Sequence, residues 1–200
     1  MSRPLVLGLT GSIGMGKSAT AAMFAGHGVP VHDADAAVHA LYAAGGAAAP
    51  RIGEAFPGTL ASDGAVDRVR LREAVLGSPE RLATLEALVH PLTREAARAF
   101  LARHADAPLV LLDIPLLFET GAQGGCDRVL VVTAPEDVQR ARVLARPGMD
   151  AAAFEAIRAK QMPDAEKRAR ADFVLDTSLG FDHAEAEVAA IIRNLTGSMP

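Results

Sequence analysis

Short apolar runs alternate along the chain with segments in which apolar residues recur at helical spacing. The runs have strand length and lie at Leu5–Leu9, Val29–Asp33, Leu109–Asp113, Val129–Thr133 and Phe173–Asp176. They are continuous rather than alternating, which is typical of parallel strands buried on both faces. The pattern therefore predicts an α/β fold in three layers, with a five-stranded parallel sheet between helices.

Helical signals fall between the expected strands. Thr133 and Glu136 stand at capping-box spacing before one of them, and Glu185 lies three residues after Asp182 at the start of the last. We expect helices over Lys17–His27, from near Pro135, from Asp150 to just before Pro163, and from Asp182 onward.

Residues between Asp35 and Pro108 show no strand pattern, and their apolar positions recur at helical intervals instead. Ser78-Pro79 predicts a helix start, and Pro91 is expected to kink or end that helix near His90 because proline has no N–H to donate. The helical positions are Val38, Leu41, Leu71, Val75, Leu76, Leu82, Leu85, Leu88 and Val89.

We therefore predict a single domain over residues 1–200 that carries a helical insertion at about 36–107. Open α/β sheets bind ligands beyond the carboxyl ends of their strands, so the insertion is placed to recognise a second substrate. Ala43–Pro50 and Gly121–Gly125 are rich in small residues and are expected to be mobile connections.

Residues Gly11–Ser18 read Gly-Ser-Ile-Gly-Met-Gly-Lys-Ser and directly follow the first apolar run. This order matches the phosphate-binding pattern G-x-x-x-x-G-K-[ST] between a strand and a helix. Small residues let backbone N–H groups turn toward an anion, and the following helix directs its positive end at it. Lys17 adds a charge for the β- and γ-phosphates of a nucleotide, and Ser18 offers a hydroxyl to Mg²⁺. A glycine-rich turn that fits by chance is disfavoured by this context.

Two carboxylates, Asp33 and Asp35, end the second apolar run and lie at the same predicted sheet edge as the phosphate loop. A carboxylate there can accept a proton from an attacking hydroxyl or hold the water shell of a metal. Helix capping explains one of them readily but not both. A metal site made of His32, Asp33, Asp35 and His39 is disfavoured, because side chains at adjacent strand positions face opposite ways.

Asp113 ends the third apolar run. In P-loop enzymes, an acidic residue at the end of a strand supports Mg²⁺ in the same way. Strands ending in aspartate are common, so a metal-shell role and a plain structural role stay open for Asp113.

Cations gather between Gln139 and Arg170, on two helical segments separated by Pro147-Gly148. We interpret residues of about 140–170 as a hinged lid that brings arginines to a transferring phosphoryl group. Pairing with nearby acids on a solvated face is the alternative for several of them. Spacing favours Arg142 and Arg146 as nucleotide contacts, since residues four apart share a helix face. The full set is Arg140, Arg142, Arg146, Arg158, Lys160, Lys167, Arg168 and Arg170.

Composition narrows the class of protein. A chain of 200 residues, half of them apolar, can bury a sizeable core, and a net charge of −4 disfavours nucleic-acid and membrane partners. The chain has no transmembrane run, and its first residues lack the features of a signal peptide, so we expect a cytoplasmic protein. Cys126, the only cysteine, is expected to be a packed residue. The sequence predicts no oligomeric state.

The order of these motifs resembles one family, the dephospho-coenzyme A kinases, over almost the whole chain. The His-Pro pair in the insertion and the Pro-Leu-Leu-Phe-Glu stretch are rarely found together in other nucleotide kinases. The matching positions are Gly8–Ser18, Asp33-Ala34-Asp35, Asp63-Gly64, Asp67-Arg68, Leu71-Arg72, His90-Pro91, Asp113–Glu119, Gln139, Arg142, Arg146, Gln161 and Ala171-Asp172.

The resemblance implies a P-loop kinase fold and ATP-dependent phosphorylation of the ribose 3′-hydroxyl of dephospho-coenzyme A, the last step of coenzyme A synthesis. It implies that Asp35 is the general base with Asp33 in support, and that Lys17, Ser18 and Mg²⁺ act on the phosphates. It assigns ATP contacts to Gly11, Ser12, Ile13, Gly14, Met15, Gly16, Lys17, Ser18, Ala19, Arg142 and Arg146, and acceptor contacts to Thr10, Asp35, Arg72, His90 and Leu117.

Two departures from the family pattern are visible. Ser12 stands where the family more often has glycine, which bears on the conformation of the phosphate loop. Asp176-Thr177-Ser178 replaces the common Asp-Asn ending after the fifth strand, which bears on packing around the adenine.

Two other functions compete with this one. A kinase for another small alcohol, nucleoside or nucleotide would share every catalytic feature and differ only in the insertion. A nucleotide-dependent switch is disfavoured by the lack of an Asn-Lys-x-Asp guanine-reading motif, and a nucleic-acid ATPase by the acidic balance of the chain.

Overall fold

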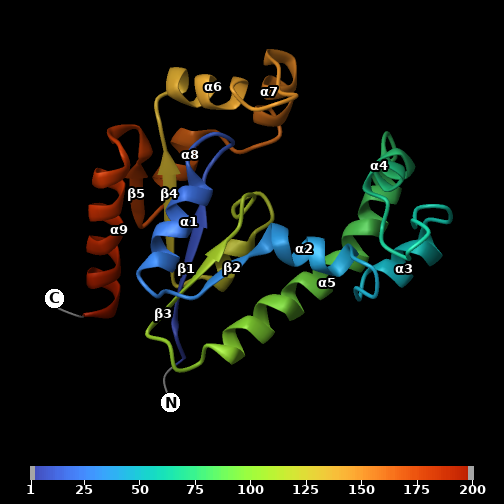
Figure 1. Ribbon diagram of the computed structural model, residues 1–200, viewed down its shortest axis with the longest axis horizontal. Coiled ribbons are helices and arrows are strands. Elements are labelled where there is room, and N and C mark those ends of the chain that lie inside the picture. The colour runs from blue at the N-terminus through green and yellow to red at the C-terminus, as the bar shows by residue number, and fades with distance from the viewer. Residues whose placement is uncertain (1–2, 198–200) are drawn as a thin grey trace. The chain divides into compact units, whose positions relative to one another are not determined.

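The computed structural model describes residues 3–197, and its strands form one sheet (Figure 1). The sheet order is β2-β3-β1-β4-β5; β1 pairs in parallel with β3 and β4, and β4 in parallel with β5. The predicted α/β fold with a five-stranded parallel sheet is confirmed. The strands are β1 (Leu5–Thr10), β2 (Val31–Asp33), β3 (Leu109–Asp113), β4 (Arg128–Thr133) and β5 (Phe173–Asp176).

The chain divides into two compact units, residues 1–32 with 104–200, and residues 33–103. Besides the sheet, the first unit contains α1 (Lys17–Gly26), η1 (Ala122–Gly125), α6 (Glu136–Leu144), α7 (Ala151–Arg158), α8 (Asp164–Ala169), η2 (Thr177–Leu179) and α9 (Phe181–Thr196). The second contains α2 (Ala34–Tyr42), α3 (Ala49–Ala55), α4 (Arg68–Val75) and α5 (Pro79–Arg103).

None of the helices within residues 3–197 combines the length and the apolar character needed to cross a membrane. Met1 and Ser2, on which the expectation about a signal peptide partly rests, lie outside the described residues.

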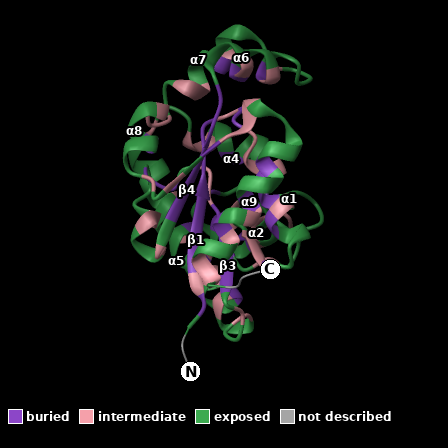
Figure 2. Cartoon of the chain, turned by 90° about the vertical axis from the view of Figure 1, so that its left-hand side faces the viewer, coloured by how far each residue is buried: buried purple, intermediate pink, exposed green. Residues whose placement is uncertain are grey.

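The first unit is built in three layers because the strands present apolar side chains on both faces. Figure 2 shows β1, β3 and β4 almost wholly buried. In β4, Leu130 and Val132 belong to the core cluster on the side of α1 and α9, whereas Val129 and Val131 belong to a separate cluster. The first cluster includes Phe24 and Val188; the second includes Leu117, Phe118 and the partly buried Met162.

The second unit has a core of its own, formed by the helical pattern that the sequence predicts. Leu71 and Val89 are buried in it, but Leu76 and Leu82 are 72% and 45% exposed. An isolated antiparallel bridge joins Leu60 to Val66. The buried members are Ala48, Ala49, Ile52, Phe56, Val66, Leu71, Val89 and Leu92.

Of the two outcomes expected at Pro91, a kink or a helix end, the helix end does not occur, because α5 continues to Arg103. The side chains of Thr93 and Arg94 donate to the carbonyl of His90 at 3.0 and 3.3 Å. These side chains add donors at the turn that contains Pro91, whereas the carbonyl that loses its backbone donor to proline is that of Ala87, four residues earlier.

Thr133 does not cap α6. Its hydroxyl donates to Asp164 Oδ2 at 2.8 Å, and the residue before α6 is Pro135, which makes no side-chain cap bond. The last helix begins at Phe181, after Gly180, one residue earlier than expected. Asp150 caps α7 as expected, accepting from Ala153 N–H at 2.7 Å.

Of Ala43–Pro50, expected to be a mobile connection, only Ala49 and Pro50 are helical, in the first turn of α3. In the second such segment, η1 occupies Ala122–Gly125.

A buried ion pair ties α8 to the segment after β3. Lys167 on α8 is fully buried, and its Nζ lies 2.9 Å from Oε1 of Glu119. Glu119 as a whole residue is exposed, but its side chain is only 17% exposed. Oε1 of Glu119 also accepts from Met162 N–H at 2.8 Å. Burial alone would raise the pKa of Glu119, but these hydrogen bonds and the Lys167 charge outweigh it and lower the pKa.

We expect Glu119→Gln to lower the free energy of unfolding by about 3 kcal/mol, because it leaves a buried ammonium without its counter-charge. Adding Lys167→Met should recover most of the loss, since the double variant buries no charge. Urea denaturation at pH 7 measures both, and equal stability of the parent and the single variant would refute the assignment.

The same pair predicts a pH dependence. The pKa of Glu119 is lower in the folded state, so its contribution is present above the unfolded-state pKa and is lost as the pH falls through the folded-state pKa. The stability gap between the parent and Glu119→Gln should therefore narrow in acid.

Candidate active site

The loop between β1 and α1 leaves the amino end of α1 without a side-chain cap. Gly14 and Gly16 have φ of 80° and 87°, in the left-handed region that favours glycine, and Gly16 precedes α1 with no side-chain cap bond. α2, α4 and α7 are each capped by an aspartate, at Asp33, Asp67 and Asp150, whereas α1, α3, α6, α8 and α9 have no side-chain cap bond. Among these uncapped helices, α6, α8 and α9 carry acidic residues in the first turn and α3 carries proline there, but α1 carries Lys17 and no acidic residue. An anion can therefore serve as the partner of the first N–H groups of α1.

Lys17, in the first turn of α1, pairs with Asp113 at the carboxyl end of β3. Lys17 Nζ lies 2.5 Å from Asp113 Oδ1, and the two side chains are 17% and 6% exposed. Asp113 is level with Leu9 of β1, which places its carboxylate at the same sheet edge as the phosphate loop.

The hydroxyl of Ser18 and the carboxylate of Asp113 are the kinds of hard oxygen donor that Mg²⁺ prefers. Ser18 is exposed in the first turn of α1, and Asp113 is buried at the end of the neighbouring strand. By the chemistry of their oxygen atoms, these two side chains are suited to Mg²⁺.

Two glutamine side chains hold the phosphate loop at Ile13. Gln161, between α7 and α8, accepts from Ile13 N–H at 3.0 Å, and Gln139 on α6 donates to the Ile13 carbonyl at 2.8 Å. Gln139 is 4% exposed. Both glutamines are part of the family pattern in the sequence, but no spacing rule links them to Ile13, so sequence reasoning missed this role.

Ser12, the first departure from the family pattern, fits the loop. Its φ is not positive, its side chain is buried, and its carbonyl accepts from Met15 N–H at 3.1 Å. A glycine is therefore not required at this position by the backbone conformation.

Most cations of the predicted lid form ion pairs with acidic side chains. This is the alternative that the sequence analysis gives for several of them. Arg158 pairs with Glu136 and, at 3.0 Å, with Glu155, and Arg140 pairs with Glu155 at 3.3 Å. Arg140 of α6 and Arg158 of α7 also lie over the ring of Phe154 on α7. The contact of Arg140 with this ring joins α6 to α7. Further pairs link Arg168 to Asp164, Arg170 to Glu166 and Lys167 to Glu119.

Arg142 and Arg146 differ in their surroundings. Arg142 is half-buried on α6, and its guanidinium donates to Thr177 Oγ1 and to the Thr177 carbonyl, both at 2.8 Å. The expectation that Arg142 and Arg146 share a helix face is wrong, because α6 ends at Leu144 and Arg146 lies beyond it. Within residues 3–197 we find no ion pair of the exposed Arg146.

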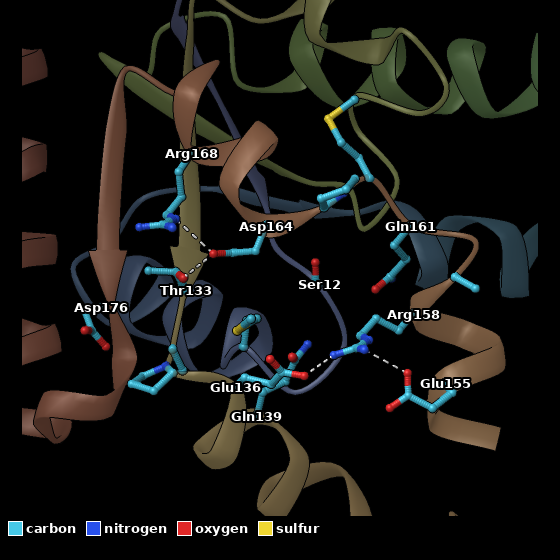
Figure 3. A pocket seen from close by; sticks show the side chains of 16 residues that line it. Ser12, Thr133, Glu136, Gln139, Glu155, Arg158, Gln161, Asp164, Arg168 and Asp176 are labelled. Carbon is cyan, nitrogen blue, oxygen red and sulfur yellow. Dashed lines mark hydrogen bonds and ion pairs between the residues drawn. The ribbon is translucent and has the colours of Figure 1, made fainter. Parts of the chain in front are cut away.

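A cavity of about 810 Å³ adjoins the phosphate loop (Figure 3). Ser12 and Met15 reach it from the loop, but Lys17 and Ser18 do not line it. In Figure 3 Asp164 projects toward this space, bound to Thr133 and Arg168. The cavity therefore lies beside the phosphate loop, between this loop, the ends of β4 and β5, and the segment that carries α6, α7 and α8.

The residues that the resemblance assigns to the acceptor are divided between the two units. In the first, Thr10 donates from its buried hydroxyl to the carbonyl of Pro115 at 3.0 Å, and Leu117 is fully buried in the core. In the second, Arg72 and His90 are exposed on α4 and α5.

The two acidic residues of the second predicted strand have different local roles. Asp33 caps α2, accepting from Ala36 N–H at 2.9 Å, whereas Asp35 is exposed in the first turn of α2 rather than at the end of a strand. His39 contacts Arg68 Nη1 at 2.8 Å through Nε2. No group of three or more metal-binding side chains occurs in the described part of the chain, so the alternative metal site has no support.

Cys126 is packed, as expected. Burial, with a smaller effect of Asp127, raises its pKa to about 11, so the thiol stays protonated at neutral pH.

Comparisons with known proteins agree with this arrangement. The family model described as dephospho-CoA kinase matches residues 5–182. The dephospho-CoA kinase of Mesorhizobium japonicum is 60% identical over 195 residues, covering 96% of this chain and 98% of that protein. The crystal structure of TT1252 from Thermus thermophilus has a TM-score of 0.85 at 39% identity, covering 98% of this chain and 100% of that one.

A dephospho-CoA kinase from Campylobacter jejuni shares the fold, with a TM-score of 0.67 at 21% identity over 96% of this chain and 98% of that one. The sequence match extends over nearly the whole chain and includes the phosphate loop, the sheet and the lid segment. This chain belongs to the dephospho-CoA kinase family.

Proposed function

We propose that this chain transfers the γ-phosphoryl group of ATP to the ribose 3′-hydroxyl of dephospho-coenzyme A, giving coenzyme A and ADP in the final step of coenzyme A synthesis. The observation that carries the proposal is an uncapped α1 amino end, with Lys17 beside it, in a chain of this family. Phosphoryl transfer depends on such fixed charges and on positioning of the two substrates.

On the donor side, N–H groups from Gly14 to Ala19 surround the β- and γ-phosphates, and Gly11, Ser12 and Ile13 complete the loop. Lys17 exchanges its bond with Asp113 for the phosphates when ATP binds, because both are anionic partners for one ammonium. Ser18, by direct contact, and Asp113, through the water shell of the ion, would hold Mg²⁺, which would neutralise charge at the phosphates.

On the acceptor side, Asp35 accepts the proton of the attacking 3′-hydroxyl, and Asp33 supports it. Asp33 accepts the cap bond of α2, whereas Asp35 is exposed and is not the cap residue. The carboxylate of Asp35 can therefore accept a hydrogen bond from a substrate hydroxyl. The acceptor contacts are assigned to Thr10, Arg72, His90 and Leu117.

Residues of about 140–170 act as the lid that excludes water from the transferring phosphoryl group. Arg142 and Arg146 bring positive charge to the nucleotide, since the other arginines of this segment that we describe are held by acids.

The test is incubation of the purified protein with MgATP and a panel of hydroxyl acceptors. ADP release should depend on dephospho-coenzyme A and should stop when EDTA removes Mg²⁺. Release that depends on a different alcohol would identify another small-molecule kinase, and slow release independent of any acceptor would identify a switch.

Asp35→Asn should lower kcat by about 10²–10⁴-fold, because the variant cannot accept the proton, while the Kd for ADP changes by less than about twofold. Asp33→Asn is the matched control, since asparagine caps helices as well as aspartate does and only the charge is lost. It should lower kcat far less. Turnover by Asp35→Asn at the parent rate would mean that the base is misassigned.

Lys17→Ala should raise the KM for ATP and lower kcat together, each by about tenfold or more, because the ammonium serves the ground state and the transition state. Lys160→Ala, an exposed lysine on the lid side, is the control and should change neither constant by more than about twofold. An unchanged KM for ATP in Lys17→Ala would argue against the phosphate contact.

A further inference from the structure

Thr177 begins η2, directly after β5, and one atom of its side chain meets three other segments. Its Oγ1 accepts from Arg142 Nη1 at 2.8 Å, and its carbonyl accepts from Arg142 Nη2 at 2.8 Å. The same Oγ1 lies 3.0 Å from the carbonyl oxygen of Met15 and 3.2 Å from that of Thr133. The hydroxyl therefore joins α6, the phosphate loop and the end of β4.

The hydrogen-bonding capacity of these groups fixes the direction of each bond. A guanidinium can only donate and a carbonyl can only accept, so the hydroxyl accepts from Arg142 and gives its single proton to a carbonyl. The nearer carbonyl is that of Met15. A methyl group in place of this hydroxyl would leave both Arg142 Nη1 and the Met15 carbonyl without this partner.

The bond to Met15 controls a neighbouring N–H group. The carbonyl of Met15 and the N–H of Gly16 belong to one planar trans peptide, so they point in opposite directions. Thr177 holds the carbonyl and thereby aims the N–H of Gly16 away from itself. The approach is close, because a Cβ added at Gly16 would lie 3.0 Å from both Oγ1 and Cγ2 of Thr177.

The turn that carries Thr177 is itself fixed. Asp176 Oδ1 accepts from the N–H and the hydroxyl of Ser178, at 2.8 and 2.6 Å, and these bonds lower the pKa of Asp176. The charged carboxylate of Asp176 therefore bonds to Ser178 across Thr177. These bonds fix the backbone on both sides of Thr177 and so position its hydroxyl.

We propose that Thr177 is a positioning residue of the nucleotide site, which orients the Met15-Gly16 peptide and the guanidinium of Arg142 toward the phosphates. This proposal rests on the proposed function and deepens it by adding a residue that touches no substrate.

The test uses two pairs of side chains that differ by a hydroxyl: Thr177 against Thr177→Val, and Thr177→Ser against Thr177→Ala. Calorimetry with MgADP, in the absence of acceptor, measures nucleotide affinity, and steady-state kinetics give the KM values for ATP and for dephospho-coenzyme A. Thr59→Val is the matched control, because it removes a buried hydroxyl that donates to the Phe56 carbonyl in the other unit.

We expect Thr177→Val and Thr177→Ala to bind ADP about tenfold more weakly, with a matching rise in the KM for ATP and little change in the KM for the acceptor. Thr177→Ser should recover most of the affinity, and Thr59→Val should retain the parent affinity for ADP. If Thr177→Val does not fold, the serine and alanine variants make the same comparison.

Parent-like ADP affinity in the valine or alanine variant would overturn the proposal, as would an equal loss in the serine variant, which would assign the effect to the methyl group. A parent protein that binds MgADP but does not phosphorylate dephospho-coenzyme A would instead contradict the proposed function, and the hydroxyl comparison would still decide the role of Thr177.

Discussion

The structure of this site depends on keeping one helix end open to an anion. Backbone N–H groups at a helix start need partners; α2, α4 and α7 obtain theirs from aspartate caps, and α6, α8 and α9, which have no such cap, carry acidic side chains in the first turn. At α1 the chain places Gly16 in the left-handed region instead, with no side-chain cap. The N–H groups left there, beside the charge of Lys17, create a site whose natural partner is phosphate. The surrounding packing holds this otherwise costly arrangement in place.

That support comes from segments distant in sequence. Gln139 and Gln161 hold the peptide groups of Ile13, and Thr177 holds the carbonyl of Met15. Gln161 lies within the segment of about 140–170 that we propose as a lid, and Gln139 lies at its border. Hydrogen bonds therefore join the phosphate loop to this segment.

The sequence predicts the sheet because its strands lie within short apolar runs, and in β1, β3 and β4 these runs are buried along nearly their whole length. It also identifies the phosphate loop, since the pattern lies between a strand and a helix. Helix ends are less predictable: Thr133 bonds to Asp164 instead of capping α6, because a partner from another element competes with the local cap. Pro91 lies inside α5 between the buried Val89 and Leu92, so packing on both sides of the proline continues the helix past the lost backbone bond.

The supporting side chains could not be predicted, because they act through contacts that no local spacing encodes. Lys167 looks like one more lid cation in the sequence, yet it is fully buried against Glu119. Thr177 is visible only as a departure from a family pattern, and its three contacts come from three elements.

The most direct measurement is a crystal structure of the protein with ADP and Mg²⁺. The account predicts the β-phosphate within hydrogen-bonding distance of the N–H groups between Gly14 and Ser18, with the ammonium of Lys17 turned from Asp113 toward it. A nucleotide bound elsewhere, with these N–H groups still lacking an anion, would contradict the account.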